Sequence, residues 1–274
     1  MKINRIDIAA ATLVGVLSIY LFVEAPTPMI NEEKTKGEKI HVHALFKIVA
    51  EENNKARKQW TKHIVVNGIK VGLKFGEDWR ESNVDKGPLP ALFLRETASH
   101  LEKSPVPLSL FLGSDFPIST SNKFKGQQAV FFEAMRVSGK NQFFYDSDVN
   151  RYTAMFPDSV VVQVCADCNN EHKDTPKKDW KMHDIMGATT WAYPHEYVTR
   201  DDLVIVIKEL RKAFKKSYLS YIEKTKSFVK QPLVGSKWPE DGYYLPQAKV
   251  FMSRLENSSA VDTLSMLMLE ENSK

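Results

Sequence analysis

Residues 160–194 read VVVQVCADCNNEHKDTPKKDWKMHDIMGATTWAYP, and they contain both cysteines of the 274-residue chain, Cys165 and Cys168. The valine-rich start, residues 160–164, predicts a short strand, and residues 188–193 predict a second one. Between the two strands the polar string after Cys168 is typical of a loop. This stretch therefore predicts a C-x-x-C pair at the end of a strand, and the fold and the chemistry both depend on it.

A C-x-x-C pair has several chemical uses, and each requires different neighbours. A thiol–disulfide redox pair needs the first cysteine at a helix N-terminus, and the loop expected after Cys168 argues against that use. A zinc site would combine Cys165 and Cys168 with His172 and His183. A simple disulfide suits an exported chain. Covalent haem attachment uses C-x-x-C-H, but Asn169 stands in the histidine position.

The cysteine stretch resembles a pattern of the PAS-like c-type haem sensor family, approximately C-x-x-C-H-N-x-H-x-x-S/T-P-K-x-D-W-K-x-G-D-V-x-G. The upstream run LSLFLGSDFPISTSNKF resembles the same family, and the similarity covers roughly residues 40–195. The matching residues are Cys165, Cys168, Asn170, His172, Thr175, Pro176, Lys177, Asp179, Trp180, Lys181, Asp184, Ile185 and Gly187.

The resemblance implies an α+β fold, a PAS-like small antiparallel sheet flanked by helices, with haem c held beside it for redox or ligand sensing. Cys165 and Cys168 would then bind the haem covalently. Two departures from the pattern concern the iron: Asn169 replaces the usual ligand, and His183 replaces a glycine. An Asn amide is a poor iron ligand, so His172 and then His183 are the candidate metal ligands.

Hydrophobic spacing and turn residues predict the elements before the cysteine stretch. Apolar residues at threes and fours indicate a first helix that Gly68 ends, and Pro in a first turn suits a second helix. The expected helices are 40–66, 89–103 and 125–137, and the expected strands are 108–112, 143–145 and 152–156.

The last third of the chain is predicted to be helical. Thr199 and Asp202 resemble a capping box that opens a long helix ended by Pro232, and a final helix is expected over residues 246–270. The long helix carries a basic face, which we interpret as a solvated surface; contact with anionic lipid headgroups or an acidic partner is the alternative.

The amino end predicts a membrane anchor. Residues 8–23 are uncharged and almost wholly apolar, behind Lys2 and Arg5. These basic residues place the N-terminus in the cytoplasm. A cleaved signal peptide is the alternative, and Pro26 argues against cleavage. The expected division is an anchor over 1–25, a linker over 26–39, the PAS-like domain over 40–195 and a C-terminal helical extension over 196–274.

The charge balance and the missing motifs argue against several classes of function. The 38 Lys and Arg against 34 Asp and Glu give a net charge of +4, which does not imply a nucleic-acid partner. No nucleophile elbow, phosphate-binding loop or zinc-protease motif occurs, so we expect no enzyme. The expected protein is a haem-family sensor or electron-transfer accessory of the bacterial inner membrane, with its main domain in the periplasm. The alternatives are a haem-free structural or interaction subunit, forming a homodimer or binding a membrane-protein partner through the C-terminal helices, and a zinc-stabilised loop.

Overall fold

The computed structural model describes residues 39–161 and 163–259, with the side chains of Val164 and Cys165 left aside. The expected membrane anchor, the linker up to residue 38 and the end of the final helix lie outside these residues. Within the described ranges, no helix is both long enough and apolar enough to cross a membrane.

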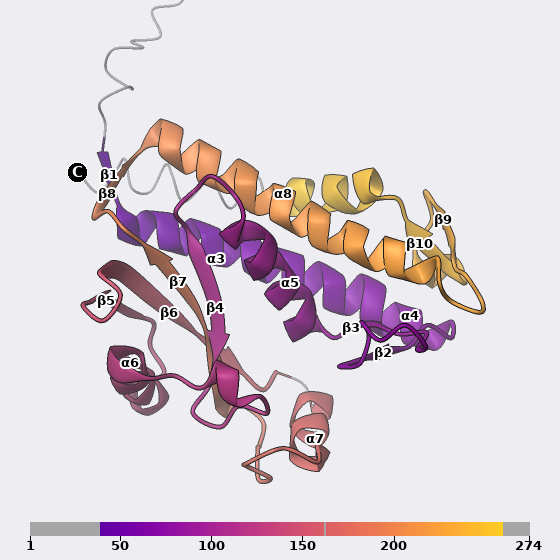
Figure 1. Cartoon of the computed structure of the whole chain (residues 1–274), viewed down its shortest axis with the longest axis horizontal. Coiled ribbons are helices and arrows are strands. Elements are labelled where there is room, and N and C mark those ends of the chain that lie inside the picture. Colours follow the sequence, from indigo (N-terminus) through magenta and orange to yellow (C-terminus); the bar gives the residue numbers. More distant parts are fainter. Residues whose placement is uncertain (1–38, 162, 260–274) are drawn as a thin grey trace, which may run out of the picture. The chain divides into compact units, whose positions relative to one another are not determined.

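The described chain has an α+β fold around a four-stranded antiparallel sheet (Figure 1). The strands follow the order β4-β7-β6-β5, with hydrogen bonds between each neighbouring pair. The sheet consists of β4 (Ser109–Gly113), β5 (Gln142–Asp146), β6 (Arg151–Ser159) and β7 (Ile185–Tyr193). The four strands predicted from residues 108–112, 143–145, 152–156 and 188–193 are therefore confirmed.

The two faces of the sheet support different clusters because successive strand residues point to opposite sides. Ala154 and Trp191, which are register partners, belong to the main core. Met155 and Ala188 belong to a smaller cluster with Phe132 of α6 (Gly126–Ser138). The predicted helix over 125–137 is thus confirmed, and it covers the face opposite the main core.

The main core is formed by long helices on the first face. The predicted helix over 40–66 is confirmed as α3 (Val42–Gln59), which runs on as the π-helix η1 (Trp60–Val66) and α4 (Asn67–Lys70). Gly68 lies inside α4, so the prediction that it ends the helix is wrong. The predicted second helix is α5 (Pro90–Glu102). At the centre, the Trp60 ring stacks on Phe93 at 4.4 Å between centroids.

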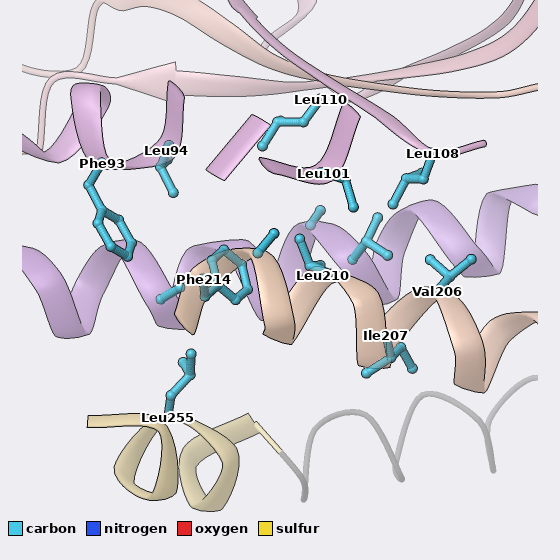
Figure 2. Packing of buried hydrophobic residues seen from close by; sticks show 14 of the residues in the cluster. Phe93, Leu94, Leu101, Leu108, Leu110, Val206, Ile207, Leu210, Phe214 and Leu255 are labelled. Carbon is cyan, nitrogen blue, oxygen red and sulfur yellow. The ribbon is translucent and has the colours of Figure 1, made fainter. Parts of the chain in front are cut away.

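The last third of the chain packs into the same core. The predicted capping box is confirmed, since Thr199 and Asp202 close the start of α8 (Arg200–Thr225). Leu210 and Phe214 of α8 pack near the α5 side chains, and Leu255 of the final helix joins them (Figure 2). That helix is described over 248–259. Residues 196–259 therefore share one hydrophobic core with residues 40–195.

Short two-stranded pairs close the edges of the fold. Lys39 at the start of β1 (Lys39–His41) pairs with Thr199 at the end of β8 (Tyr197–Thr199), in antiparallel register. The parallel pairs join β2 (Phe75–Gly76) to β3 (Gly87–Pro88) and β9 (Leu233–Gly235) to β10 (Tyr244–Pro246). The point where the described chain begins thus lies beside the start of α8.

The strand predicted over residues 160–164 is wrong. Residues 160 and 161 lie outside any strand, and α7 (Gln163–Glu171) begins two residues later. The buried Val160 side chain belongs to a small cluster with Ala166 and Trp180, against which Met186 of β7 packs. The β-branched run therefore ends the sheet and caps a small separate cluster.

Candidate functional site

Residues 160–184, here called the cysteine insert, connect the adjacent strands β6 and β7. The Val160 N–H donates to the Asp184 carbonyl at 2.9 Å, and the His183 N–H donates to the Val160 carbonyl at 3.0 Å. These bonds hold the two ends of the insert together. The intervening chain leaves the sheet and carries the C-x-x-C pair at the end where α7 lies (Figure 1).

The C-x-x-C pair lies in a helix, so the prediction that it ends a strand is wrong, and the same helix continues to Glu171, where a loop was expected. Cys165 is the third residue of α7, and Cys168 is an exposed free thiol one turn later. Residues three apart on a helix are neighbours on one face. The argument against a thiol–disulfide redox pair relied on a missing helix after the cysteines, so that argument does not hold.

The polar residues of the insert that match the resembled pattern stabilise its fold. The Asn170 side chain makes two bonds with the Trp180 backbone, accepting from its N–H at 2.8 Å and donating to its carbonyl at 3.0 Å. Trp180 is thereby held with its ring buried against Ala166. Lys177 lies over the ring at 4.7 Å, and its carbonyl accepts from the Thr175 hydroxyl at 2.8 Å. These motif residues therefore build a platform for α7.

The backbone at positions 183 and 187 explains why the resembled pattern has glycine there. His183 has φ +72°, a left-handed conformation that glycine adopts most easily, and the pattern has glycine there. At Gly187, a Cβ would lie 2.5 Å from the Gly113 carbonyl oxygen, so a side chain does not fit. Both glycine positions in the pattern are thus explained by the backbone of the insert and of β7.

His172 is engaged on both ring nitrogens. Its Nδ1 accepts from the Asp174 N–H at 3.2 Å, and its Nε2 lies 3.0 Å from a Glu77 carboxylate oxygen. With Nδ1 as the acceptor, the hydrogen-bond network assigns the proton to Nε2, which donates to Glu77. In this arrangement neither nitrogen of His172 has a lone pair free for a metal.

Three further side chains that could by their chemistry bind iron are not gathered around α7. His183 is exposed in its turn, while Met155 is fully buried in the cluster under α6. His63 lies on η1 beside Trp238 and Glu240. Among the residues that the structure describes, no three His, Cys, Asp or Glu side chains converge as a metal site.

The described residues around α7 fit haem c only in part: the cysteines suit covalent attachment, but the iron ligand is missing. Two cysteines three residues apart on an exposed helix suit two thioether bonds to one haem. Asn169 remains a poor iron ligand by its chemistry, and His172 would bind iron only after giving up Glu77. The site as it stands supplies the attachment residues without supplying an imidazole.

The aromatic residues of the sheet and of the cysteine insert do not form one pocket. Trp191 and Tyr193 belong to the main core, whereas Trp180 belongs to the insert. Phe144 stacks on Phe131 of α6 with centroids 3.8 Å apart. They are distributed over three clusters and act as packing residues.

A polar groove of about 380 Å³ lies between α3 and the ends of β6 and β7. Asp158 in its wall is paired with Arg57 and accepts from the Thr189 hydroxyl at 2.9 Å. Sequence reasoning missed this groove because its residues come from distant segments with no common motif. Its other polar lining residues are Lys47, Glu51, Asn54 and Asn141.

Comparison of the chain with known protein families, with curated proteins and with solved structures found no match, so the functional argument rests on the residues described above.

Proposed function

We propose that this protein is a membrane-anchored, PAS-like member of the c-type haem sensor family, acting in redox or ligand sensing or as an electron-transfer accessory, and not as an enzyme. The observation that carries the proposal is the cysteine insert. Both cysteines lie on α7, where Cys168 is exposed, and the motif residues Asn170 and Trp180 help to form the platform beneath that helix.

The fold supports the PAS-like assignment. A small antiparallel sheet with helices on both faces is the arrangement that the resemblance implies, and the order β4-β7-β6-β5 provides it. The insert leaves this sheet at the ends of its two central strands, β6 and β7. A change at α7 would reach the sheet through Val160 and Asp184, where the insert is hydrogen bonded.

The chain's residues would have distinct roles toward the haem. Cys165 and Cys168 would hold it covalently, and an iron centre there would supply a group that changes its oxidation or ligand state. His172 is the nearest imidazole in sequence, and Glu77 competes with iron for it. His183 is the second candidate.

The proposed location follows from the amino-terminal sequence. An anchor over residues 1–25 with its basic end in the cytoplasm would place the domain in the periplasm of the bacterial inner membrane. Haem attachment to cysteine pairs and a sensor or electron-transfer role are compatible with that compartment.

A haem stain on a denaturing gel, with a pyridine haemochrome spectrum, tests the proposal. The full chain is exported in a host with cytochrome c maturation, beside a Cys165→Ser/Cys168→Ser control. We expect a stained band in the native sequence alone. Glu77→Gln should then favour His172 as iron ligand and shift the absorption spectrum, whereas His172→Ala should abolish that shift. A colourless native chain would overturn the haem function.

A haem-free interaction subunit is the second candidate, and the engaged state of His172 favours it. In that case the insert would keep its fold without iron. The same colourless preparation separates this candidate from a zinc-stabilised loop, because zinc binding by Cys165 and Cys168 would appear in elemental analysis of the purified chain and disappear in the double serine variant.

A further inference from the structure

Positive charge is concentrated in residues 203–238, which cover most of α8 and the loop after it. Residues 203–238 contain nine Lys or Arg and two Glu, whereas the whole chain carries only +4. The rest of the chain is therefore net negative. Such segregation of charge onto one segment produces a directed electrostatic field rather than an evenly solvated surface.

The exposed residues of α8 form one stripe. Positions at helical spacing share a face about 120° wide, and we call their solvent-exposed set the lysine face. No acidic side chain in the described part of the chain pairs with Lys208, Lys215 or Lys216. The two glutamates on α8 are already paired with lysines three residues on. The lysine face consists of Val204, Ile205, Lys208, Lys212, Lys215, Lys216, Leu219 and Lys226, and the acidic residues Asp201 and Glu223 are also exposed on it.

The lysine face continues into an apolar loop after α8, residues 226–237, here called the tip. Val229 is 97% exposed and Leu233 is 66% exposed. The tip contains no acidic residue, and two of its three lysines lie over tyrosine rings, Lys230 over Tyr243 at 4.7 Å and Lys237 over Tyr244 at 4.8 Å. Apolar side chains flanked by lysines and tyrosines suit the boundary between lipid headgroups and acyl chains.

The described chain begins beside the start of α8, at one end of the lysine face. Lys39 pairs with Thr199, so the segment that arrives from the proposed anchor meets the first turn of α8. From there α8 extends about 39 Å to the tip. A domain tethered at one end of the lysine face, and lying with α8 along the membrane plane, would bring the whole face and the tip to the headgroups. The tether also raises the effective concentration of the surface at the membrane.

We propose that the lysine face and the tip form a docking site for anionic phospholipid headgroups, with Val229 and Leu233 inserting between them. This inference rests on the membrane anchor of the proposed function. It does not depend on haem, because none of its residues belongs to the cysteine insert. Docking would fix the orientation of the domain on the membrane.

The test follows hydrogen–deuterium exchange of the full chain on vesicles of phosphatidylcholine, alone or mixed with phosphatidylglycerol. Flotation with the neutral vesicles reports the anchor separately. On the anionic vesicles we expect exchange of the tip amides to slow by at least about fivefold, the factor that one lysine near an anionic surface contributes. The slowing should vanish at about 1 M salt, where the Debye length falls to about 3 Å.

Two variants and one control sharpen the result. Lys215→Glu/Lys216→Glu and Val229→Ser/Leu233→Ser should each remove the protection of the tip, and both change exposed residues, so their circular dichroism should match the native chain. The control, Lys125→Glu/Lys140→Glu, reverses two exposed lysines at the ends of α6 and should keep the protection.

The outcomes separate the proposals. Flotation with neutral vesicles without any lipid-dependent protection would overturn docking and leave the anchor standing. Protection on anionic vesicles without flotation on neutral ones would support docking and overturn the anchor. Protection that depends on protein density but not on lipid charge would assign the surface to a second copy of the chain and overturn lipid docking.

Discussion

The buried pair of Glu52 and Arg211 gives the sharpest prediction about the fold. Glu52 on α3 is fully buried, and its two oxygens accept from Arg211 Nη2 at 2.6 Å and Nε at 3.0 Å. Arg211 also donates to the Ser259 hydroxyl at 3.3 Å, so it joins α3, α8 and the final helix. Replacing Arg211 leaves a buried carboxylate without its cation, which costs about 3–5 kcal/mol. Because Arg211 is 24% exposed, water will reach the site, and we expect a loss of unfolding free energy of about 3 kcal/mol, at the lower end of this range.

Urea unfolding of the full chain in mild detergent, followed by circular dichroism and tryptophan fluorescence, measures this cost. Arg211→Met should lower the free energy of unfolding by that amount. Arg211→Lys keeps the charge but loses the two-pronged contact, so its loss should be smaller. Glu52→Met/Arg211→Met removes both charges and should recover most of the stability.

One result would refute the reasoning directly. If Arg211→Met costs less than about 1 kcal/mol, the pair is not the buried bidentate contact described. If urea unfolding shows two steps and Arg211→Met shifts only one of them, residues 196–259 do not share a cooperative core with residues 40–195.

Three further predictions concern single positions. Gly187→Ala should cost about 1–3 kcal/mol because its Cβ meets the Gly113 carbonyl, whereas Gly235→Ala, with open space around it, should leave the urea midpoint nearly unchanged. His183→Gly should raise the free energy of unfolding by up to about 1 kcal/mol, since glycine relieves the left-handed strain; an unchanged or lower value would show that the turn is unstrained. Burial, and then a neighbouring arginine, hold the pKa of His63 below its usual 6.5. Its neutral form therefore contributes stability that is lost as the pH falls below 6.5 through the lowered pKa, and His63→Gln should flatten this decline in urea midpoint if the assignment is right.

Much of the fold could be predicted because its signals are local. Apolar spacing identified the helices, and Thr199 with Asp202 marked the start of α8. Gly139 ends α6 in a left-handed conformation, which glycine adopts easily after a helix. Four strands were recognisable from β-branched and aromatic runs between turn residues. In each of these elements the side chains that decide the structure are close in sequence.

The missed features depend on contacts between distant residues. The string QVCADCNNE has weak helix propensity, and its two ends were predicted as strand and loop, yet it forms α7 because Ala166 packs on Trp180 and Asn170 holds the Trp180 backbone. The valines before it favour a strand by propensity, but Val160 is buried in that same cluster. The partner of His172, Glu77, is 95 residues away, and no sequence pattern connects them.

The closure of the cysteine insert at Val160 and Asp184 has an evolutionary consequence. Because the insert begins and ends at neighbouring strand ends and packs its own small cluster, it can change its chemistry while β6 and β7 keep their register. A substitution such as asparagine for histidine at position 169 then carries little penalty for the sheet. Selection can remove or exchange a cofactor in the cysteine insert and retain the sheet. We therefore expect proteins with the same fold to differ most in this insert.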